Sequence, residues 1–224
     1  TYYPTNNERK ISTKNYLRAD LNINNDAFVF GSFNNSYKIS SKEFSIWMKL
    51  LKKINNSYLF LLVSDELTKQ NLINEIEKNN QDPKKVKFLN FINNEEHLAR
   101  HQLIDLYLDT FNYNGHTSSI DALYTGVPVV SKIGKSFSSR VCASILKSIN
   151  MDELIVSNEE EYYNLAYQIA TNTKKYNKLK LALKNNIKSS PLFNTKKYVK
   201  NFEKALQLAF ENKLNKGNLE NIVV

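Results

Sequence analysis

The sequence predicts an α/β fold in which a parallel β-sheet is covered by helices on both faces. Strand-length runs of β-forming residues alternate with segments whose apolar residues recur at the helical period. The expected strands start near residues 27, 58, 86, 105 and 127, which leaves room for a helical crossover between most of them. With 224 residues, 42% of them hydrophobic, the chain can bury a substantial core. Together these observations predict a Rossmann-like domain.

The first half of the chain contains three expected strands, each followed by a helix. Ser40 and Glu43 have the spacing of a capping box at the start of the first helix. Phe44, Trp47 and Leu51 then recur on one face, which predicts that this face is buried. The expected strands are residues 27–33, 58–63 and 86–89, and the expected helices cover about 40–54, 66–78 and about 95 onward.

The second half continues the alternation and ends in helices. We expect strands at 105–109 and 127–130, and helices at 116–124, about 138–149, about 158–185 and about 196–213. In the last helix the expected inward stripe is Tyr198, Phe202, Ala205 and Ala209. The expected organisation is an N-terminal linker or edge segment (1–24), a lobe (25–190), and a C-terminal helix and tail packed back on that lobe (191–224).

The formal net charge is +9, and its distribution decides its meaning. Residues 1–170 contain 19 Lys and Arg against 19 Asp and Glu, whereas residues 171–224 contain 12 Lys against 3 Glu. Because most of the expected lobe is neutral overall, no nucleic-acid partner is expected. The basic C-terminal helices present either a solvated face or a contact for an acidic surface, such as another lobe or an anionic membrane.

Other features bound the class of protein. The single cysteine, Cys142, excludes an internal disulfide and favours a reducing compartment, which predicts a cytoplasmic location. Cys142 lies among apolar residues of an expected helix, so core packing is its expected role. No apolar run approaches the about 18 residues that a transmembrane segment needs. The chain opens on Thr1 rather than Met, and we expect it to be part of a longer protein.

The candidate site follows the expected strands, because ligands of parallel α/β sheets bind at the carboxyl ends of the strands. Residues 109–121 leave a strand, pass Gly115 and enter a helix through Thr117 and Ser118. The N–H groups of that helix start and the two hydroxyls form a possible phosphate site. Asp121 lies one turn further on, where a carboxylate could accept bonds from ribose hydroxyls. The alternative is an ordinary helix cap.

Two further places carry candidate ligand groups. Lys38 follows the first strand, where it is either a partner for a diphosphate or a solvated loop lysine. His97 and His101 are four residues apart on an expected helix, but a zinc site would need a third ligand that is not evident nearby. The ring of His97 and the guanidinium of Arg100 could instead pack on and hydrogen-bond a base.

Several blocks of the sequence resemble the C-terminal catalytic lobe of the O-GlcNAc transferase/SPINDLY-type glycosyltransferases, family 41. They occur in the order of that family and extend over roughly residues 25–210. The resemblance implies the donor-binding lobe of a GT-B fold. The blocks are Phe33-Asn34-Asn35-Ser36-Tyr37-Lys38-Ile39, Glu95-Glu96-His97-Leu98-Ala99-Arg100, Leu108-Asp109-Thr110, Asn114-Gly115-His116-Thr117-Ser118-Ser119-Ile120-Asp121, Ser139-Arg140-Val141 and Ser190-Pro191-Leu192-Phe193-Asn194-Thr195.

The resemblance implies roles on the phosphate side of the donor. Lys38 would contact the diphosphate and stabilise the leaving UDP. His116 would lie near the sugar and the β-phosphate, and Thr117 and Ser118 would bind phosphate from the helix start. Asn35 stands where the family usually has Gln, which gives a shorter arm toward the phosphate.

The resemblance also implies roles on the nucleoside side. His97 and Arg100 would lie at the uracil and the nearby phosphate or ribose, and Asp121 would hold the ribose. Asn94 stands where the family often has Lys, so one ribose contact of the family differs in this chain.

The activity implied by the resemblance is the inverting transfer of a sugar, with N-acetylglucosamine expected, from UDP to protein Ser or Thr hydroxyls. No metal or other cofactor is implied, and UDP-sugar is the donor substrate. In this family an N-terminal lobe supplies the acceptor side and the catalytic base, and tetratricopeptide repeats are expected upstream. Two alternatives stay open: another GT-B nucleotide-sugar enzyme, including a branch that modifies Asn, and a non-catalytic nucleotide-binding module.

Overall fold

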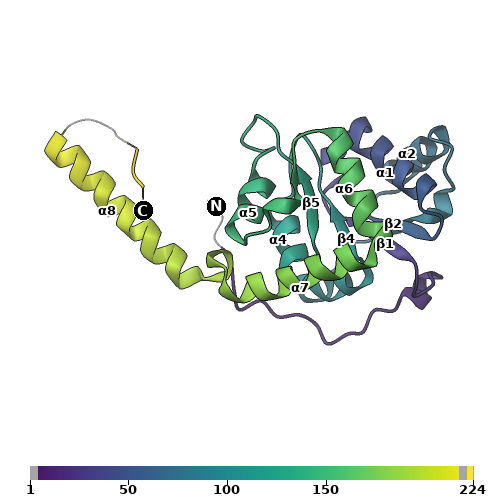
Figure 1. Ribbon diagram of the computed structural model, residues 1–224, viewed down its shortest axis with the longest axis horizontal. Helices are drawn as coiled ribbons and strands as arrows, with labels where there is room; N and C mark the ends of the chain where they lie inside the picture. Colours follow the sequence, from purple (N-terminus) through teal and green to yellow (C-terminus); the bar gives the residue numbers. More distant parts are fainter. Residues whose placement is uncertain (1–4, 217–220, 224) are drawn as a thin grey trace.

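The computed structural model describes residues 5–216 and 221–223, and its centre is a parallel sheet of six strands (Figure 1). The strand order is β3-β2-β1-β4-β5-β6, so the chain crosses from one edge to the middle after β3. The expected parallel α/β fold is confirmed. The sixth strand was not expected, because two residues carry no recognisable pattern. The strands are β1 (Phe28–Ser32), β2 (Ser57–Leu62), β3 (Val86–Leu89), β4 (Leu106–Leu108), β5 (Val129–Lys132) and β6 (Ile155–Val156).

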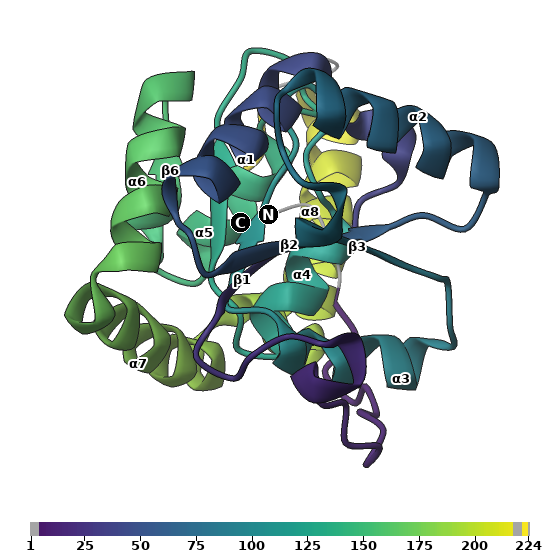
Figure 2. The ribbon, with the colours of Figure 1, turned by 90° about the vertical axis from the view of Figure 1, so that its right-hand side faces the viewer.

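Helices cover both faces of the sheet. Figure 2 shows α1 and α2 on one side of β1, β2 and β3, with α3 and α4 on the other side. The expected capping box of Ser40 and Glu43 is confirmed at the start of α1. The helices are α1 (Ser41–Lys53), α2 (Glu66–Lys78), α3 (Asn94–Ala99), α4 (Thr117–Tyr124), α5 (Val141–Ser148), α6 (Glu159–Thr171), α7 (Thr173–Ser189) and α8 (Thr195–Lys216).

The segment expected as one helix over 158–185 is two helices, α6 and α7. Asn172 between them is extended, with φ −120° and ψ 93°, and its side chain accepts a hydrogen bond from the backbone N–H of Lys175. Asn172 therefore ends α6 and caps the start of α7. Because the apolar period runs through both helices, no pattern in the sequence marks the break.

The core lies between the central strands and the helices of each face. Phe60 of β2, Leu106 of β4 and Val129 of β5 are fully buried. On one face, the indole N–H of Trp47 in α1 donates to the hydroxyl of Tyr162 in α6 over 3.4 Å. This contact joins two helices that are far apart in the sequence, and α6 also packs on β5. The strand ends are thereby held in a fixed arrangement.

Residues 5–18, which we call the N-terminal strap, lie along the lobe rather than leading away from it (Figure 1). The N–H of Ser12 donates to the carbonyl of Glu95 over 3.1 Å. Further along, Arg18 Nη2 lies 2.8 Å from Asp105 Oδ2 next to β4. The segment expected as a linker or edge is thus anchored on α3 and beside the sheet.

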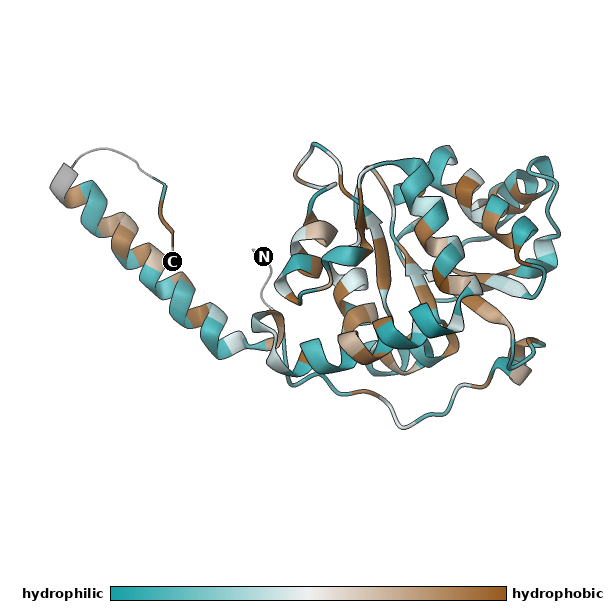
Figure 3. Cartoon of the chain, in the orientation of Figure 1, coloured by the Kyte–Doolittle hydropathy of each residue, from teal (hydrophilic) through white to brown (hydrophobic). Residues whose placement is uncertain are grey.

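The last helix, α8, points away from the lobe, contrary to the expectation that it packs back on it (Figure 1). Phe202, Leu206, Phe210 and Leu214 are 53–68% exposed. Figure 3 shows hydrophobic residues, in brown, recurring along α8. The stripe expected to face inward is therefore wrong for Phe202 and Ala209, which are both exposed. A helical pattern identifies an apolar face but not the surface that covers it. Among the described residues, no helix is long and apolar enough to cross a membrane.

Phe60 and Phe210 provide a matched test of this arrangement, because Phe60 is fully buried and Phe210 is 65% exposed. We expect Phe60→Ala to lower the free energy of unfolding by about 3–5 kcal/mol. Phe210→Ala should change it by less than about 0.5 kcal/mol. Urea denaturation followed by the fluorescence of Trp47 measures both. A comparable loss for the two variants would show that α8 packs on the lobe in solution.

Candidate functional site

A pocket of about 390 Å³ lies at the carboxyl ends of the strands, and we call it the strand-end pocket. It receives residues from the loops after β1, β3 and β4, which the parallel sheet brings to one edge. Five of the predicted site residues line it together: Asn35, Lys38, His116, Thr117 and Ser118. The other lining residues are Phe33, Asn34, Leu62, Phe91 and Tyr113.

Lys38 is fixed at the edge of this pocket by two neighbours. Its Nζ donates to the carbonyl of Asn114 over 3.2 Å and lies 4.0 Å from the centre of the Tyr113 ring. The side chain is half-buried, and this burial lowers its pKa from the ordinary value of a lysine. Because an ammonium group has three donors, Lys38 keeps hydrogen-bonding capacity for an anion in the pocket.

A buried carboxyl group, Asp109, organises the turn that leads to α4. Its Oδ1 accepts from the N–H of Gly115 over 2.6 Å, and its Oδ2 accepts from the hydroxyl of Ser131 in β5 over 2.6 Å. Burial raises the pKa of Asp109 to about 6, and these two hydrogen bonds oppose the rise. Asp109 therefore ties the end of β4 to the start of α4 and to β5.

Gly115 allows the backbone before α4 to lie close to the first turn of that helix. A Cβ at this position would lie 2.3 Å from the Ser119 hydroxyl oxygen and 2.7 Å from that of Ser118. No side chain fits there without movement of the helix start. The N-terminal end of α4, with Thr117 and Ser118, is thereby set against the strand-end pocket. The partial positive charge of that helix end favours an anion.

The side chain of Asn34 joins the loop after β1 to α4. Its Nδ2 donates to the Thr110 hydroxyl over 3.2 Å, and its Oδ1 accepts from the Ser118 hydroxyl over 2.6 Å. The hydroxyl proton of Ser118, expected for a phosphate, is thus directed at Asn34. Ser118 instead closes a contact between the two loops that form the pocket.

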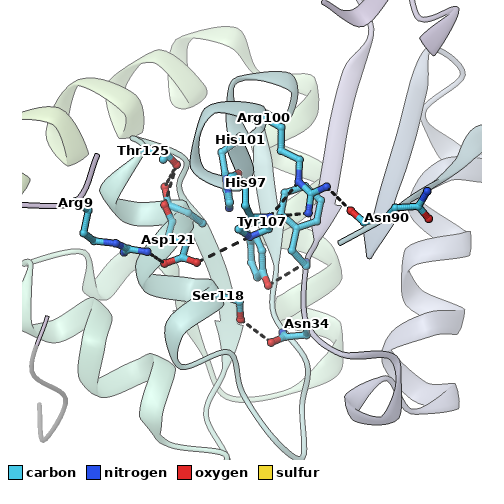
Figure 4. A network of polar contacts seen from close by, with 12 residues as sticks. Arg9, Asn34, Asn90, His97, Arg100, His101, Tyr107, Ser118, Asp121 and Thr125 are labelled. Carbon is cyan, nitrogen blue, oxygen red and sulfur yellow. Dashed lines mark hydrogen bonds and ion pairs between the residues drawn. The ribbon is translucent and has the colours of Figure 1, made fainter. Parts of the chain in front are cut away.

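The three remaining predicted residues, His97, Arg100 and Asp121, are not among the residues that line the strand-end pocket. Figure 4 shows them together in one network of polar contacts. Arg100 is 4% exposed; its Nε donates to Nδ1 of His97 over 3.0 Å and its Nη1 to the carbonyl of Asn90 over 2.7 Å. Arg100 therefore holds the ring of His97. Since Nδ1 accepts, the proton of a neutral His97 is assigned to Nε2.

His97 Nε2 faces Asp121 Oδ2 at 3.9 Å (Figure 4). Burial, together with the charges of Arg100 and Arg9, lowers the pKa of His97 to about 4. Burial raises the pKa of Asp121, whereas Arg9 lowers it through an ion pair with Asp121 Oδ1. At neutral pH the ring of His97 is a neutral donor.

The second histidine of the expected pair, His101, is fully buried. Its Nδ1 donates to the carbonyl of His97 over 2.8 Å, and its ring meets the edge of Phe33 with 4.9 Å between the centres. Over residues 5–216 and 221–223, no three His, Cys, Asp or Glu side chains form a group that could hold a metal ion. The pair is a packing and hydrogen-bonding unit behind the loop after β1.

Sequence reasoning assigned no role to Asp109, Asn34, Tyr113 or Arg9. Asp109 and Asn34 could have been found, because each is a polar residue that follows an apolar strand. Tyr113 lies between two of the blocks that carry the resemblance, and no pattern places its ring under Lys38. No local signal marks Arg9, which contacts Asp121 from 112 residues away.

A model of glycosyl transferase family 41 matches residues 5–202 of this chain. A UDP-N-acetylglucosamine–peptide N-acetylglucosaminyltransferase of Caenorhabditis elegans is 33% identical over 189 residues, which are 84% of this chain and 16% of that protein. A probable transferase of the same name, SPINDLY of Solanum lycopersicum, is 31% identical over 185 residues, 81% of this chain and 20% of that protein. The chain therefore spans about 16–20% of the length of these curated relatives.

Solved structures share the fold. The O-GlcNAc transferase of Thermobaculum terrenum, in a mutant form, has a TM-score of 0.74 and 26% identity, and the match covers 80% of this chain and 36% of that one. Sucrose-phosphate synthase of Thermosynechococcus elongatus has a TM-score of 0.65 and 16% identity, covering 93% of this chain and 51% of that one. The second likeness shows the fold alone, which is the C-terminal lobe of GT-B glycosyltransferases.

The buried carboxyl group of Asp109 gives the unfolding free energy a definite pH dependence. Its pKa is about 6 in the folded chain, against about 3.9 for an unperturbed aspartate. Between these values the folded chain holds a proton that the unfolded chain has released. The contribution of this group to stability is therefore full below about pH 4 and is lost as the pH rises to about 6, with a limiting slope of about 1.4 kcal/mol per pH unit.

Asp109→Asn removes this titration. We expect the unfolding free energy of the wild type minus that of Asp109→Asn to fall between about pH 4 and pH 6 in urea denaturation. Asp26→Asn, at an exposed turn, is the matched control. A difference that stays constant across this window, or that rises with pH, would contradict the assignment of a raised pKa to Asp109.

Proposed function

This chain belongs to glycosyl transferase family 41, and we propose that it is the nucleotide-sugar-binding lobe of an inverting glycosyltransferase. The transferred sugar is N-acetylglucosamine, the donor is its UDP derivative, and the acceptors are Ser or Thr hydroxyls of proteins. The names of the two relatives support the sugar and the peptide acceptor. The observation that carries the proposal is the strand-end pocket, which places Lys38 and His116 beside the N-terminal end of α4.

The chemistry needs positive charge where the diphosphate departs. As the sugar–phosphate bond breaks, negative charge grows on the β-phosphate. Lys38 and the first-turn N–H groups of α4 face the same pocket and can stabilise that charge without rearrangement. In this proposal these groups, together with His116 and Thr117, stabilise the negative charge on the β-phosphate. No metal or other cofactor is assigned. Asn35 extends the same wall of the pocket.

The nucleoside occupies the neighbouring side, at His97 and Asp121. Neutral His97 offers its Nε2–H, and the Asp121 carboxylate accepts from ribose hydroxyls. We assign to Arg100, which is buried behind His97, the role of orienting that ring. This assignment differs from the place at the uracil and the nearby phosphate or ribose that the resemblance implies for Arg100.

Acceptor binding and the catalytic base belong to parts outside this chain in the proposal: an N-terminal lobe and upstream tetratricopeptide repeats. We place the protein in the cytoplasm; the buried free thiol of Cys142 fits a reducing compartment. The exposed basic helix α8 is the proposed contact for an acidic surface. Alone, this chain should bind UDP but transfer sugar poorly.

Calorimetric titration of the 224-residue chain with UDP, GDP and ADP tests the proposed donor. We expect UDP to bind at least about tenfold more tightly than the other two, because the three nucleotides differ only in the base and His97 lies on the proposed nucleoside side of the site. Equal affinities would indicate a site that does not recognise the base. Preference for GDP or ADP would identify another nucleotide-sugar enzyme, and the absence of any nucleotide binding would refute the proposed function.

Lys38→Met tests the catalytic role in a longer protein that contains this chain and transfers sugar. We expect kcat to fall about 10²–10³-fold, because an electrostatic donor to the developing charge is lost. UDP affinity should fall by much less. The control is Lys42→Met. Lys42 lies on the surface of α1 with 72% of its side chain exposed, and its Nζ is 3.7 Å from Oε1 of Glu159 in α6. An unchanged kcat in Lys38→Met would rule out the role.

A further inference from the structure

We propose that Arg9 is a positioning residue for the nucleoside site, which holds the Asp121 carboxylate charged and oriented toward the ribose. The inference rests on the proposed function, because it assigns the ribose to Asp121. It adds a residue of the N-terminal strap to a site otherwise built from the loops and helices of the lobe. The strap would then be part of the donor site and not a connector.

The contact between Arg9 and Asp121 is buried. Nη2 of Arg9 donates to Oδ1 of Asp121, and the two side chains are only 10% and 6% exposed (Figure 4). A carboxylate that loses water is destabilised unless a charge or donor compensates. Arg9 supplies the positive charge that stabilises the Asp121 carboxylate in place of water, whereas the carboxylates of exposed surface ion pairs remain stabilised by solvent.

Arg9 is itself fixed by Tyr124 at the end of α4. The hydroxyl of Tyr124 donates to the backbone carbonyl of Arg9 over 3.1 Å, and the guanidinium carbon lies 5.3 Å from the centre of the Tyr124 ring. Both the backbone and the side chain of Arg9 therefore have a place on α4. Helix α4 therefore carries both Asp121 and Tyr124, and Tyr124 holds Arg9 beside Asp121.

The rest of the strap keeps Arg9 in register. Before Arg9, the hydroxyl of Thr195 donates to the carbonyl of Thr5 over 2.5 Å. After it, the N–H of Ser12 donates to the carbonyl of Glu95 over 3.1 Å. Since anchors stand on both sides, the ion pair is not the chance contact of a loose terminus.

The second oxygen of Asp121 is directed at the nucleoside side. Oδ2 lies 3.9 Å from Nε2 of His97, which is longer than a hydrogen bond. A ribose hydroxyl between the two groups could accept from His97 and donate to Asp121. Because Arg9 takes Oδ1, it leaves Oδ2 for this second contact.

The charge on Asp121 depends on the groups that face it: Arg9 from the strap, His97 from α3 and Tyr107 from β4. Arg9 is the cation of this set, since His97 is neutral at pH 7. Loss of Arg9 removes the interaction that lowers the pKa of Asp121 and leaves the effect of burial, which raises it. The carboxyl group would then become protonated at a higher pH and lose its capacity as a charged acceptor.

The test is calorimetric titration of the 224-residue chain with UDP, comparing the wild type with Arg9→Ala, Arg9→Gln and Arg9→Lys. We expect Arg9→Ala and Arg9→Gln to weaken UDP binding at least about tenfold. Arg9→Lys should restore part of the affinity, because it returns the charge without the planar fork. Lys10→Ala is the matched control: it removes a neighbouring exposed charge and should leave binding unchanged.

Two readouts separate positioning from a loss of structure. The affinity of Arg9→Ala for UDP, relative to that of the wild type, should rise with pH as Asp121 loses its proton. For 2′,3′-dideoxyuridine diphosphate, which lacks the ribose hydroxyls, the wild type and Arg9→Ala should bind alike. A general distortion of the lobe would weaken both ligands equally. If Arg9→Ala does not fold, Arg9→Gln gives the same comparison with most of the side chain retained.

The outcomes distinguish this inference from the proposed function. If the wild type does not bind UDP, the proposed function fails. If the wild type binds UDP and the Arg9 variants bind it as tightly or more tightly, the proposed function stands and the positioning role is wrong. An equal loss of both diphosphates, with no dependence on pH, also overturns the role, because the strap would then act only on the fold.

Discussion

The rest of the site depends on the hydrogen bonds of the buried Asp109 carboxyl group. Asp109 directly follows β4, and its two oxygens accept from the N–H of Gly115 and the hydroxyl of Ser131. Burying such a group is unfavourable unless these bonds replace its water. Because they fix the turn between β4 and α4 relative to β5, the N-terminal end of α4 faces the pocket, and with it the partial positive charge that an anion requires.

The proposed phosphate side and the proposed nucleoside side of the site are assembled in different ways. On the phosphate side, Lys38 and α4 come from loops that each follow a strand of the parallel sheet, so strand pairing alone brings them together. On the nucleoside side, Asp121 depends on Arg9 from the strap and on a histidine held by Arg100. The first side is a property of the lobe, and the second also requires a segment outside its core.

This difference explains what could be predicted from the sequence. Five of the six strands, most helices and the residues of the proposed phosphate side were predictable, because apolar periodicity marks the elements and a parallel sheet collects their carboxyl ends. The pair of Arg9 and Asp121 was not, since no local pattern reports a contact across 112 residues. The break between α6 and α7 was not predictable either, because it depends on one extended residue, Asn172. The place of α8 was also not predictable, because an apolar helix face carries no information about what covers it.

The most direct measurement is a crystal structure of this chain with UDP bound. We predict that the diphosphate lies within hydrogen-bonding distance of Lys38 Nζ and of the N-terminal end of α4, with the ribose hydroxyls at Asp121. A nucleotide bound elsewhere would contradict the central claim. The clearest such case would be the groove between the strap and α3, where Ser12 and Gln102 form part of the lining.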